Sequence, residues 1–170
     1  MKKAAILIED HYEVLEAWYP YLRLREQGME TVFIGPEKKT YSSKDGYPAA
    51  ADQVIQGADA STFDAVVIPG GYAPDLMRRN ESMVRFVKEA FAANAVVAMI
   101  CHAGWMGVSA DIFRGRNATC FFAIKDDVVN AGARYRDEAV VTDGNLITSR
   151  TPSDLPEFCT EIIRQLTSTA

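Results

Sequence analysis

Four short apolar segments, interleaved with longer amphipathic ones, most constrain the fold of this chain. They are Lys3–Ile8 (KAAILI), Met29–Gly35 (METVFIG), Phe63–Gly71 (FDAVVIPGG) and Ala95–Ile100 (AVVAMI). Continuous apolar runs of this length are typical of strands that are buried on both faces. Apolar residues at helical spacing occupy the segments Val14–Gln27, Glu81–Asn94, His102–Phe113 and Pro152–Leu166. The alternation predicts an α/β protein with a doubly wound parallel sheet and helices on both faces.

Two further segments have the pattern of β-hairpins. The sequence shows no boundary between domains. Asp-Gly pairs lie inside Tyr41–Asp52 and Ala139–Ser149, each between short strand-like stretches. There is no repeat, low-complexity stretch or linker in the 170 residues. We therefore expect a single domain over residues 1–170.

Composition excludes several classes of partner. The net charge is −5 and no basic run is present, so the sequence predicts no nucleic-acid partner. No segment approaches the ~18 apolar residues of a membrane-spanning helix, and no signal peptide is recognisable, so we expect a cytoplasmic protein without a membrane partner. Three cysteines without a CxxC, and only two histidines, predict neither a disulfide framework nor a metal site.

Polar and small residues follow three of the four apolar segments. They are the acidic stretch Glu9–Glu16, the turn Pro69-Gly70-Gly71 and the pair Cys101-His102. Ligands in open α/β sheets bind at the carboxyl ends of the strands. The sequence therefore predicts one site that these three segments form together.

Cys101 is the candidate nucleophile of that site. It follows a strand and begins a helix, as at a nucleophile elbow, and a helix N-terminus favours the thiolate. The alternative is an inert buried cysteine. Cys120 and Cys159 lie in apolar surroundings typical of a strand and a helix in the core, and we expect both to be structural.

The neighbours of Cys101 suggest supporting roles. His102 is a candidate general base, its backbone N–H is a candidate oxyanion donor, and a surface histidine is the alternative. Gly70 and Gly71 allow close approach of a ligand and offer N–H groups for an oxyanion hole, although Pro-Gly-Gly is also an ordinary turn. Glu13 and Glu16 share one helix face, and one that turns inward toward the sulfur would have a raised pKa and could share a proton with it.

Several stretches resemble one family of proteins. Pro-Gly-Gly followed by AMICHAGWMGVSA, together with EVLEAWYPYLRLREQG, VIPGGYAPDLMR and LITSRTPSDL, is similar to the DJ-1/PfpI superfamily and most similar to its PfpI branch, the intracellular protease I type. The resemblance runs from Lys3 to about Leu166. It implies a flavodoxin-like three-layer sandwich with a mostly parallel central sheet and helices on both faces. Class I glutamine amidotransferases share the elbow but use a downstream histidine, and no histidine follows His102.

The resemblance also implies roles for individual residues. Cys101 would be the nucleophile, Glu16 would hydrogen-bond its sulfur, and Gly70, Gly71 and the His102 amide would form the oxyanion region. Asp75 would orient His102 from a neighbouring subunit, at a position where the archaeal peptidases typically have Glu.

Two more positions follow from the same resemblance. Phe121 stands where several relatives carry Tyr or His, which predicts a more apolar pocket. Arg150 matches an arginine near the dimer contact, although an ordinary surface arginine is the alternative.

The family resemblance implies chemistry that depends on the cysteine and needs no cofactor. We expect an enzyme acting on reactive carbonyls, of glyoxalase or deglycase type, with a small carbonyl compound or a glycated protein as substrate. The alternatives are an intracellular cysteine peptidase, a redox-sensing stress protein that uses oxidation of Cys101, and an interaction module with a vestigial site. The expected assembly is a homodimer or a hexamer built as a trimer of dimers.

Overall fold

A mostly parallel sheet forms the centre of the molecule. The computed structural model describes residues 1–168, and within them the sheet has seven strands in the order β10-β11-β7-β6-β1-β2-β5. All neighbouring strands are parallel except the β10–β11 pair. The strands are β1 (Lys3–Leu7), β2 (Glu30–Gly35), β5 (Gln53–Val54), β6 (Ala65–Ile68), β7 (Val96–Ile100), β10 (Val140–Asp143) and β11 (Leu146–Ser149).

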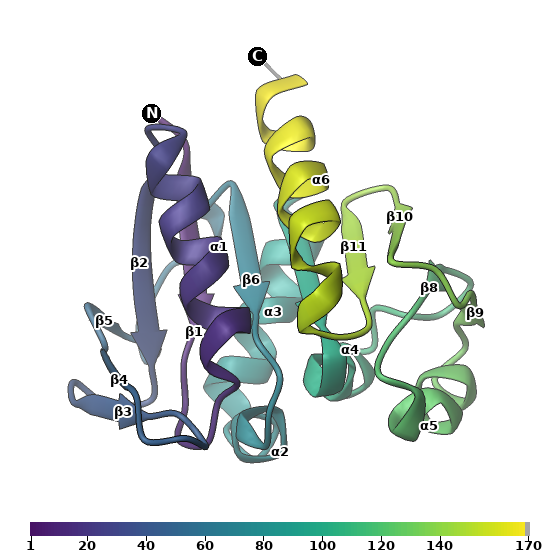
Figure 1. Cartoon of the computed structure of the whole chain (residues 1–170), viewed down its shortest axis with the longest axis horizontal. Coiled ribbons are helices and arrows are strands. Elements are labelled where there is room, and N and C mark those ends of the chain that lie inside the picture. The colour runs from purple at the N-terminus through teal and green to yellow at the C-terminus, as the bar shows by residue number, and fades with distance from the viewer. Residues whose placement is uncertain (169–170) are drawn as a thin grey trace.

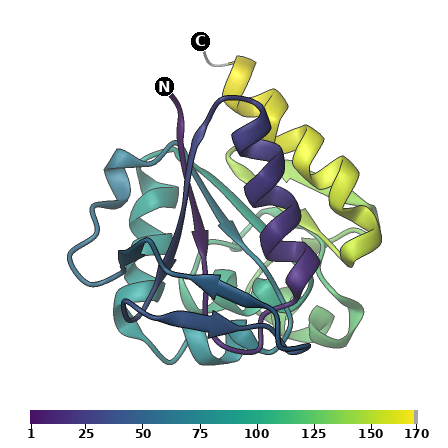
Figure 2. The same cartoon turned by 60° about the vertical axis from the view of Figure 1, so that its left-hand side comes forward.

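Helices cover both faces of this sheet (Figures 1 and 2). On one face α1 and α6 pack side by side over β1, β2, β7 and β11. On the other, α3 lies over β6 and β7 and contacts α4, which also packs against α2 and α5. Their bounds are α1 (Val14–Glu26), α2 (Ala73–Met77), α3 (Glu81–Ala92), α4 (Gly104–Ser109), α5 (Lys125–Asn130) and α6 (Leu155–Ser168). The predicted flavodoxin-like three-layer sandwich is confirmed.

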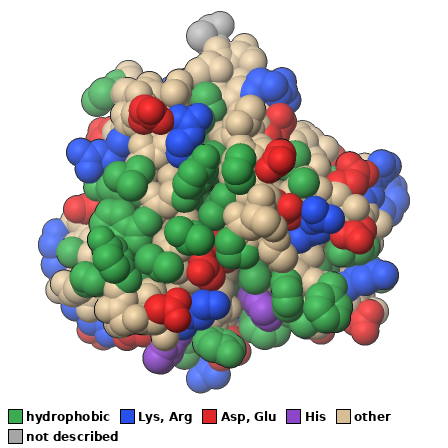
Figure 3. All heavy atoms as spheres, in the orientation of Figure 1, with side chains coloured by type: hydrophobic (Ala, Val, Ile, Leu, Met, Phe, Trp, Pro, Cys, Tyr) green, Lys and Arg blue, Asp and Glu red, His purple; other side chains and the backbone are tan. Residues whose placement is uncertain are grey.

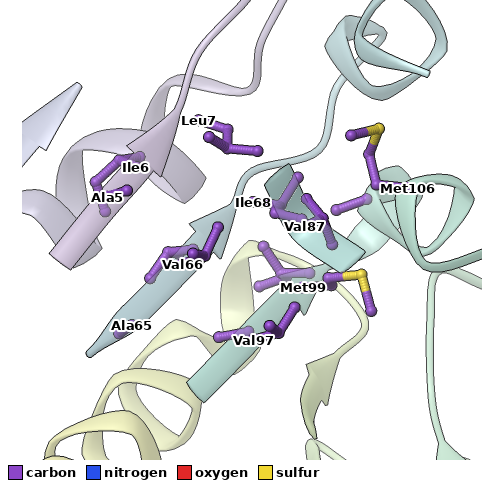
Figure 4. Close-up of a cluster of buried hydrophobic side chains, with 14 of the residues drawn as sticks. Ala5, Ile6, Leu7, Ala65, Val66, Ile68, Val87, Val97, Met99 and Met106 are labelled. Atoms are coloured by element: carbon purple, nitrogen blue, oxygen red, sulfur yellow. The ribbon is translucent and has the colours of Figure 1, made fainter. Parts of the chain in front are cut away.

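The core explains why the strands read as unbroken apolar runs. All residues of β6 and all but the first residue of β1 are fully buried, since helices cover both of their faces. Figure 4 shows Ile68 of β6 and Met99 of β7 packed beside Val87 of α3 and Met106 of α4. Burial on both sides leaves no position on these strands where a polar side chain would meet water.

Both predicted hairpins are present, and one of them extends the main sheet. Strands β3 (Thr40–Ser42) and β4 (Pro48–Ala50) form a separate antiparallel pair. Strand β11 pairs with β10 on one side and with β7 on the other, which brings the segment after Ser149 next to the end of β7. A second separate pair, β8 (Asn117–Ala118) with β9 (Arg134–Tyr135), was not predicted.

The helix predicted over His102–Phe113 is shorter than expected. A 3₁₀ turn covers Cys101–Ala103, and α4 ends at Ser109. Asp111 then adopts φ +54°, a left-handed conformation that ends a helix and reverses the chain. The reversal buries Phe113 completely in the core. Cys120 is buried as predicted but lies just outside β8, and Cys159 is buried in α6.

Hydrophobic side chains gather on the left of the face in Figure 3, over α1 and β2. Leu15 and Leu22 of α1 and Tyr47 of the β3–β4 turn are more than half exposed. Trp18 packs edge-on against Phe33 and Tyr47 between them. We call this surface the α1 patch. Within residues 1–168, none of the helices combines the length and the apolar character needed to cross a bilayer.

Candidate active site

Cys101 occupies a strained turn where β7 ends. Ile100 is extended, whereas Cys101 has φ +61°, a conformation that costs a residue with a side chain about 1 kcal/mol or more. The 3₁₀ turn begins at the same residue. Gly104 follows, and a Cβ there would lie 3.1 Å from Ile124 Cδ1 and 3.2 Å from Val128 Cγ2, so the small residue lets α4 approach α5 closely. The geometry is that of a nucleophile elbow.

Gly70 separates the cysteine from a buried carboxyl group. Its N–H donates to Glu16 Oε1 over 2.9 Å. A Cβ on Gly70 would lie 2.6 Å from that oxygen, 2.8 Å from Cys101 Cβ and 3.1 Å from the His102 nitrogen. Only glycine fits between these groups.

The Gly70 bond changes the expected oxyanion region. Because the Gly70 N–H is donated to Glu16, it is not free for a ligand, which corrects the expectation that Gly70 supplies an oxyanion donor. The N–H groups of His102 and Gly71 instead face the Cys101 sulfur, and both lower the pKa of its thiol. Gly71 has φ +77°, and a Cβ on it would lie 2.5 Å from the His11 carbonyl oxygen.

Glu16 is the acidic residue of α1 that turns inward. It is fully buried, and within residues 1–168 its Oε2 has no hydrogen-bond partner. Burial, with a smaller contribution from the charge of Glu13, raises the pKa of Glu16 to about 8 against the opposing Gly70 N–H bond. At neutral pH, Glu16 therefore carries a proton beside the thiol. Glu13 caps the helix by accepting the Glu16 N–H over 3.0 Å.

The Cys101 thiol is not acidic in the resting chain. Burial, reinforced by the negative charge of Glu16, raises its pKa to about 12. The expectation that a helix N-terminus would favour the thiolate is wrong here. The helix behind Cys101 is one short turn plus the six residues of α4, so its dipole is small, and desolvation outweighs it.

The imidazole ring of His102 lies beside the thiol of Cys101. Its Nδ1 lies 3.2 Å from Cys101 Sγ. Burial, followed by the charge of Lys44, lowers the pKa of His102, so the ring is neutral at pH 7 and can accept a proton. Within residues 1–168, no carboxylate forms a hydrogen bond or an ion pair with this ring.

A cavity of about 210 Å³ opens above these groups. Its walls are mainly apolar, and Phe121 forms part of them. The lining comprises Glu13, Glu16, Lys44, Gly71, Tyr72, Cys101, His102, Phe121, Thr151 and Pro152. A larger hollow of about 480 Å³ lies at the opposite end of the sheet, and neither cysteine nor histidine lines it.

Sequence reasoning missed four of these lining residues. Lys44 and Tyr72 come from turns, and Thr151 and Pro152 come from the loop that follows β11. Nothing in their local sequence marks them, because the topology alone brings those loops to the end of β7. In the described residues no group of three or more His, Cys, Asp or Glu side chains is arranged to hold a metal ion.

Three predicted site residues are not part of the cavity wall: Gly70, which lies behind it beside Glu16, and the two residues Asp75 and Arg150. Asp75 is on α2, where its Oδ2 accepts from Arg79 over 2.6 Å at the surface, and it does not contact His102 of its own chain. Arg150 holds the buried Asp154 through its Nε and Nη2 groups, and its Nη1 donates to Asp137 over 3.0 Å. By binding Asp154, Arg150 holds the chain segment that carries the lining residues Thr151 and Pro152.

A cysteine on a strand-to-helix elbow, with a histidine and a protonated carboxyl group beside it, defines a class of cysteine-dependent α/β enzymes. Within that class, the chain belongs to the DJ-1/PfpI family, whose model matches residues 2–165.

Named relatives align over nearly the whole chain. A deglycase of Pyrococcus horikoshii is 38% identical over 164 residues, which are 96% of this chain and 99% of that protein. A protein and nucleic acid deglycase of Escherichia coli is 39% identical over 168 residues, 97% of this chain and 98% of its own length.

A solved two-domain protein of Anabaena variabilis contains a DJ-1/ThiJ/PfpI-like domain and a ferritin-like domain. It is 48% identical to this chain, with a TM-score of 0.97. The match covers 98% of this chain but 48% of the Anabaena chain.

Proposed function

We propose that this protein uses Cys101 to process reactive carbonyl compounds, as a glyoxalase or a protein deglycase. The observation that carries the proposal is the protonated Glu16 on one side of Gly70 with the Cys101 thiol on the other. A neutral acid and a neutral base, His102, then flank one nucleophile at pH 7, which is the arrangement that carbonyl addition requires. The two deglycase relatives support the same class of substrate.

The first step forms a bond between the cysteine sulfur and an aldehyde carbon. The thiol proton passes to Nδ1 of His102 as the sulfur attacks, and the carbonyl electron pair moves to oxygen. The N–H groups of Gly71 and His102 face the reaction centre and stabilise the negative charge on that oxygen. Return of the proton from His102 to the oxygen gives a neutral hemithioacetal.

The later steps depend on the substrate. With methylglyoxal, His102 removes the proton of the aldehyde carbon while Glu16 donates its own proton to the ketone oxygen. His102 then protonates the former ketone carbon and the hydroxyl of the former aldehyde carbon returns its proton to Glu16, which gives a lactoyl thioester. Water cleaves this thioester to lactate and free thiol.

A glycated side chain holds the same carbon as a hemiaminal, and there the sulfur forms its bond to that carbon as the carbon–nitrogen bond breaks. Glu16 donates its proton to the departing amine or guanidine, and the thiol proton held by His102 then restores Glu16. The resulting hemithioacetal follows the methylglyoxal route. Each route consumes one water and regenerates Cys101.

The size of the cavity supports a small substrate. About 210 Å³ with mainly apolar walls suits a three-carbon oxoaldehyde or the adduct at the end of one side chain. An extended peptide would need a longer groove on both sides of the sulfur. We therefore place carbonyl chemistry ahead of peptide hydrolysis.

We propose a homodimer, or a hexamer built from three dimers, as the working assembly. The exposed Leu15, Leu22 and Tyr47 of the α1 patch support an interface there, since covering them would bury apolar area. We also propose that Asp75, at the surface of α2, orients His102 of a neighbouring subunit in that assembly. Three unbridged cysteines support the cytoplasm as the proposed compartment.

Product analysis by proton NMR tests the proposed activity. The wild-type protein is incubated separately with methylglyoxal, with the methylglyoxal adduct of N-acetylarginine, and with an unmodified peptide. We expect lactate from the first and lactate plus free N-acetylarginine from the second. Cleavage of the peptide with neither carbonyl substrate consumed would replace the proposal with a peptidase.

A further inference from the structure

The His102 ring contacts two aromatic side chains of its own subunit. The Phe121 ring is tilted against it, with the centroids 4.9 Å apart. Trp105 meets it edge-on, with the centroids 5.3 Å apart and the planes at 60°. Such contacts restrict the rotation of an imidazole that no carboxylate of residues 1–168 holds.

Trp105 is itself fixed by polar groups from two other helices. Its indole N–H donates to Asp127 Oδ2 of α5 over 2.8 Å. The guanidinium of Arg78, the residue that caps α2, lies over the indole ring 5.7 Å from its centroid. Arg78 in turn donates from Nε to Ser109 Oγ at the end of α4 over 3.0 Å. The indole therefore has one defined orientation although it is only partly buried.

We propose that Trp105, held by Asp127, is a positioning residue that keeps His102 Nδ1 on the Cys101 sulfur. The proposal rests on the role given to His102 as proton acceptor. Without the indole edge, the imidazole can rotate toward solvent, where it no longer reaches a sulfur 3.2 Å away. The contact with Trp105 comes from within one subunit, so this alignment does not depend on a neighbouring chain.

The surrounding charges allow a selective test. Lys44 from the β3–β4 turn is the charged group that acts on His102, whereas Arg78 at the end of α2 and Asp127 on α5 contact the Trp105 indole. Asp126 precedes Asp127 and is also exposed. Within residues 1–168, the indole N–H bonds to Asp127 and not to Asp126, so Asp126 serves as the matched control.

The experiment measures alkylation of Cys101 by iodoacetamide, with peptide mapping to separate it from the buried Cys120 and Cys159. Trp105→Leu is expected to slow alkylation at neutral pH about tenfold, a fraction of what a general base contributes. Trp105→Phe, which keeps the ring but not the N–H, and Asp127→Asn are expected to slow it less, and Asp126→Asn not at all. In a His102→Gln background, none of these substitutions is expected to have a further effect.

The double variants distinguish positioning from general packing. Equal slowing by Trp105→Leu with and without His102, or no slowing in either, overturns the proposal. If circular dichroism shows that Trp105→Leu is unfolded, Trp105→Phe and Asp127→Asn decide by the same comparison. Alkylation needs no carbonyl turnover, so failure of the methylglyoxal assay with the coupling intact rejects the proposed function and leaves this inference standing.

Discussion

Glu16 and Cys101 face each other across Gly70, in a gap that cannot hold even one methyl group. A Cβ on that glycine would lie 2.6 Å from the Glu16 oxygen and 2.8 Å from Cys101 Cβ. The carboxyl group has lost all contact with water, and its pKa rises to about 8 through burial. A protonated acid beside a neutral thiol is the central feature of the site.

Glu16→Gln removes the proton and keeps an oxygen for the Gly70 N–H. We expect kcat/KM for methylglyoxal to fall about 100-fold, because a positioned acid–base group contributes about that much. In the wild type, activity should decline as pH rises through about 8, where Glu16 loses its proton. Rate profiles from acid to alkaline pH check this, with the exposed Glu26→Gln on the same helix as control. An unchanged alkaline limb in Glu16→Gln would assign that limb to another group.

The same pKa makes stability depend on pH. A carboxyl group whose pKa is about 8 folded and about 4.3 unfolded favours the folded state below the lower value, and this contribution is lost as pH rises through the higher one. Wild-type protein should therefore lose stability relative to Glu16→Gln between about pH 5 and about pH 8.5, by a few kcal/mol. Urea unfolding of both proteins at the two pH values measures the difference. Parallel curves would show that Glu16 ionises freely in the fold.

Gly70→Ala forces a methyl group between the acid and the nucleophile. We expect a stability loss of about 1–3 kcal/mol from overpacking, and a larger loss of kcat, since Glu16 and Cys101 are pushed apart. Gly57→Ala is the control, because its φ of +82° brings backbone strain with no atom within 4 Å. Thermal melts and initial rates are compared. If both variants kept full activity, the close approach would be irrelevant to catalysis.

Arg150 has a structural role although its side chain is partly exposed to solvent. Asp154 is 5% exposed, and its carboxylate accepts from two side-chain nitrogens and from the backbone N–H of Arg150. Arg150→Met leaves that buried carboxylate with the backbone N–H of residue 150 but without its cation, at a cost of about 2 kcal/mol.

The KM for methylglyoxal should rise as well in Arg150→Met, because Thr151 and Pro152 line the cavity. Arg164→Met, which removes an exposed pair with Glu161, should change neither stability nor KM. If Arg150→Met lost stability but kept a normal KM, Arg150 would stabilise the fold without affecting substrate binding.

Substitution of Asp75 tests whether the active site is complete within one subunit or is shared between two. Its ion pair with Arg79 lies at the surface, so Asp75→Asn should leave the unfolding free energy nearly unchanged. If the side chain orients His102 of a neighbour, the substitution lowers kcat in the assembled protein, and Arg79→Gln does not. Leu22→Lys in the α1 patch should shift light-scattering mass toward the monomer and remove the Asp75 effect. If Asp75→Asn and wild type had equal kcat in the assembled protein, His102 would be aligned by groups of its own subunit alone.

The fold was predictable because burial dictates its pattern. Strands covered on both faces must be apolar throughout, so β1, β6 and β7 are visible in the sequence within a residue or two. The two-residue strands β8 and β9 carry no such pattern, because neither face of that pair must be wholly apolar. The end of α4 depends on one left-handed residue, Asp111, which periodicity does not reveal.

The site was predictable where a strand end marks it and not elsewhere. Cys101 directly follows one apolar segment, Gly71 ends another, and Glu16 lies on the helix that begins soon after the first of the four. Lys44 and Thr151, in contrast, reach the cavity only through the tertiary arrangement of loops. The direction of the Cys101 pKa was missed for a physical reason. A helix start is visible in sequence, but the depth of burial that outweighs it is a property of the folded chain.

Methylglyoxal consumption by Cys101→Ala, compared with wild type, tests the central claim most directly. Cys159→Ala is the matched control, since that thiol is fully buried in α6 and does not line the cavity. We predict that Cys101→Ala loses at least about 1,000-fold in kcat/KM, in keeping with removal of a covalent nucleophile, while Cys159→Ala retains turnover. Turnover by Cys101→Ala equal to that of wild type would contradict the account.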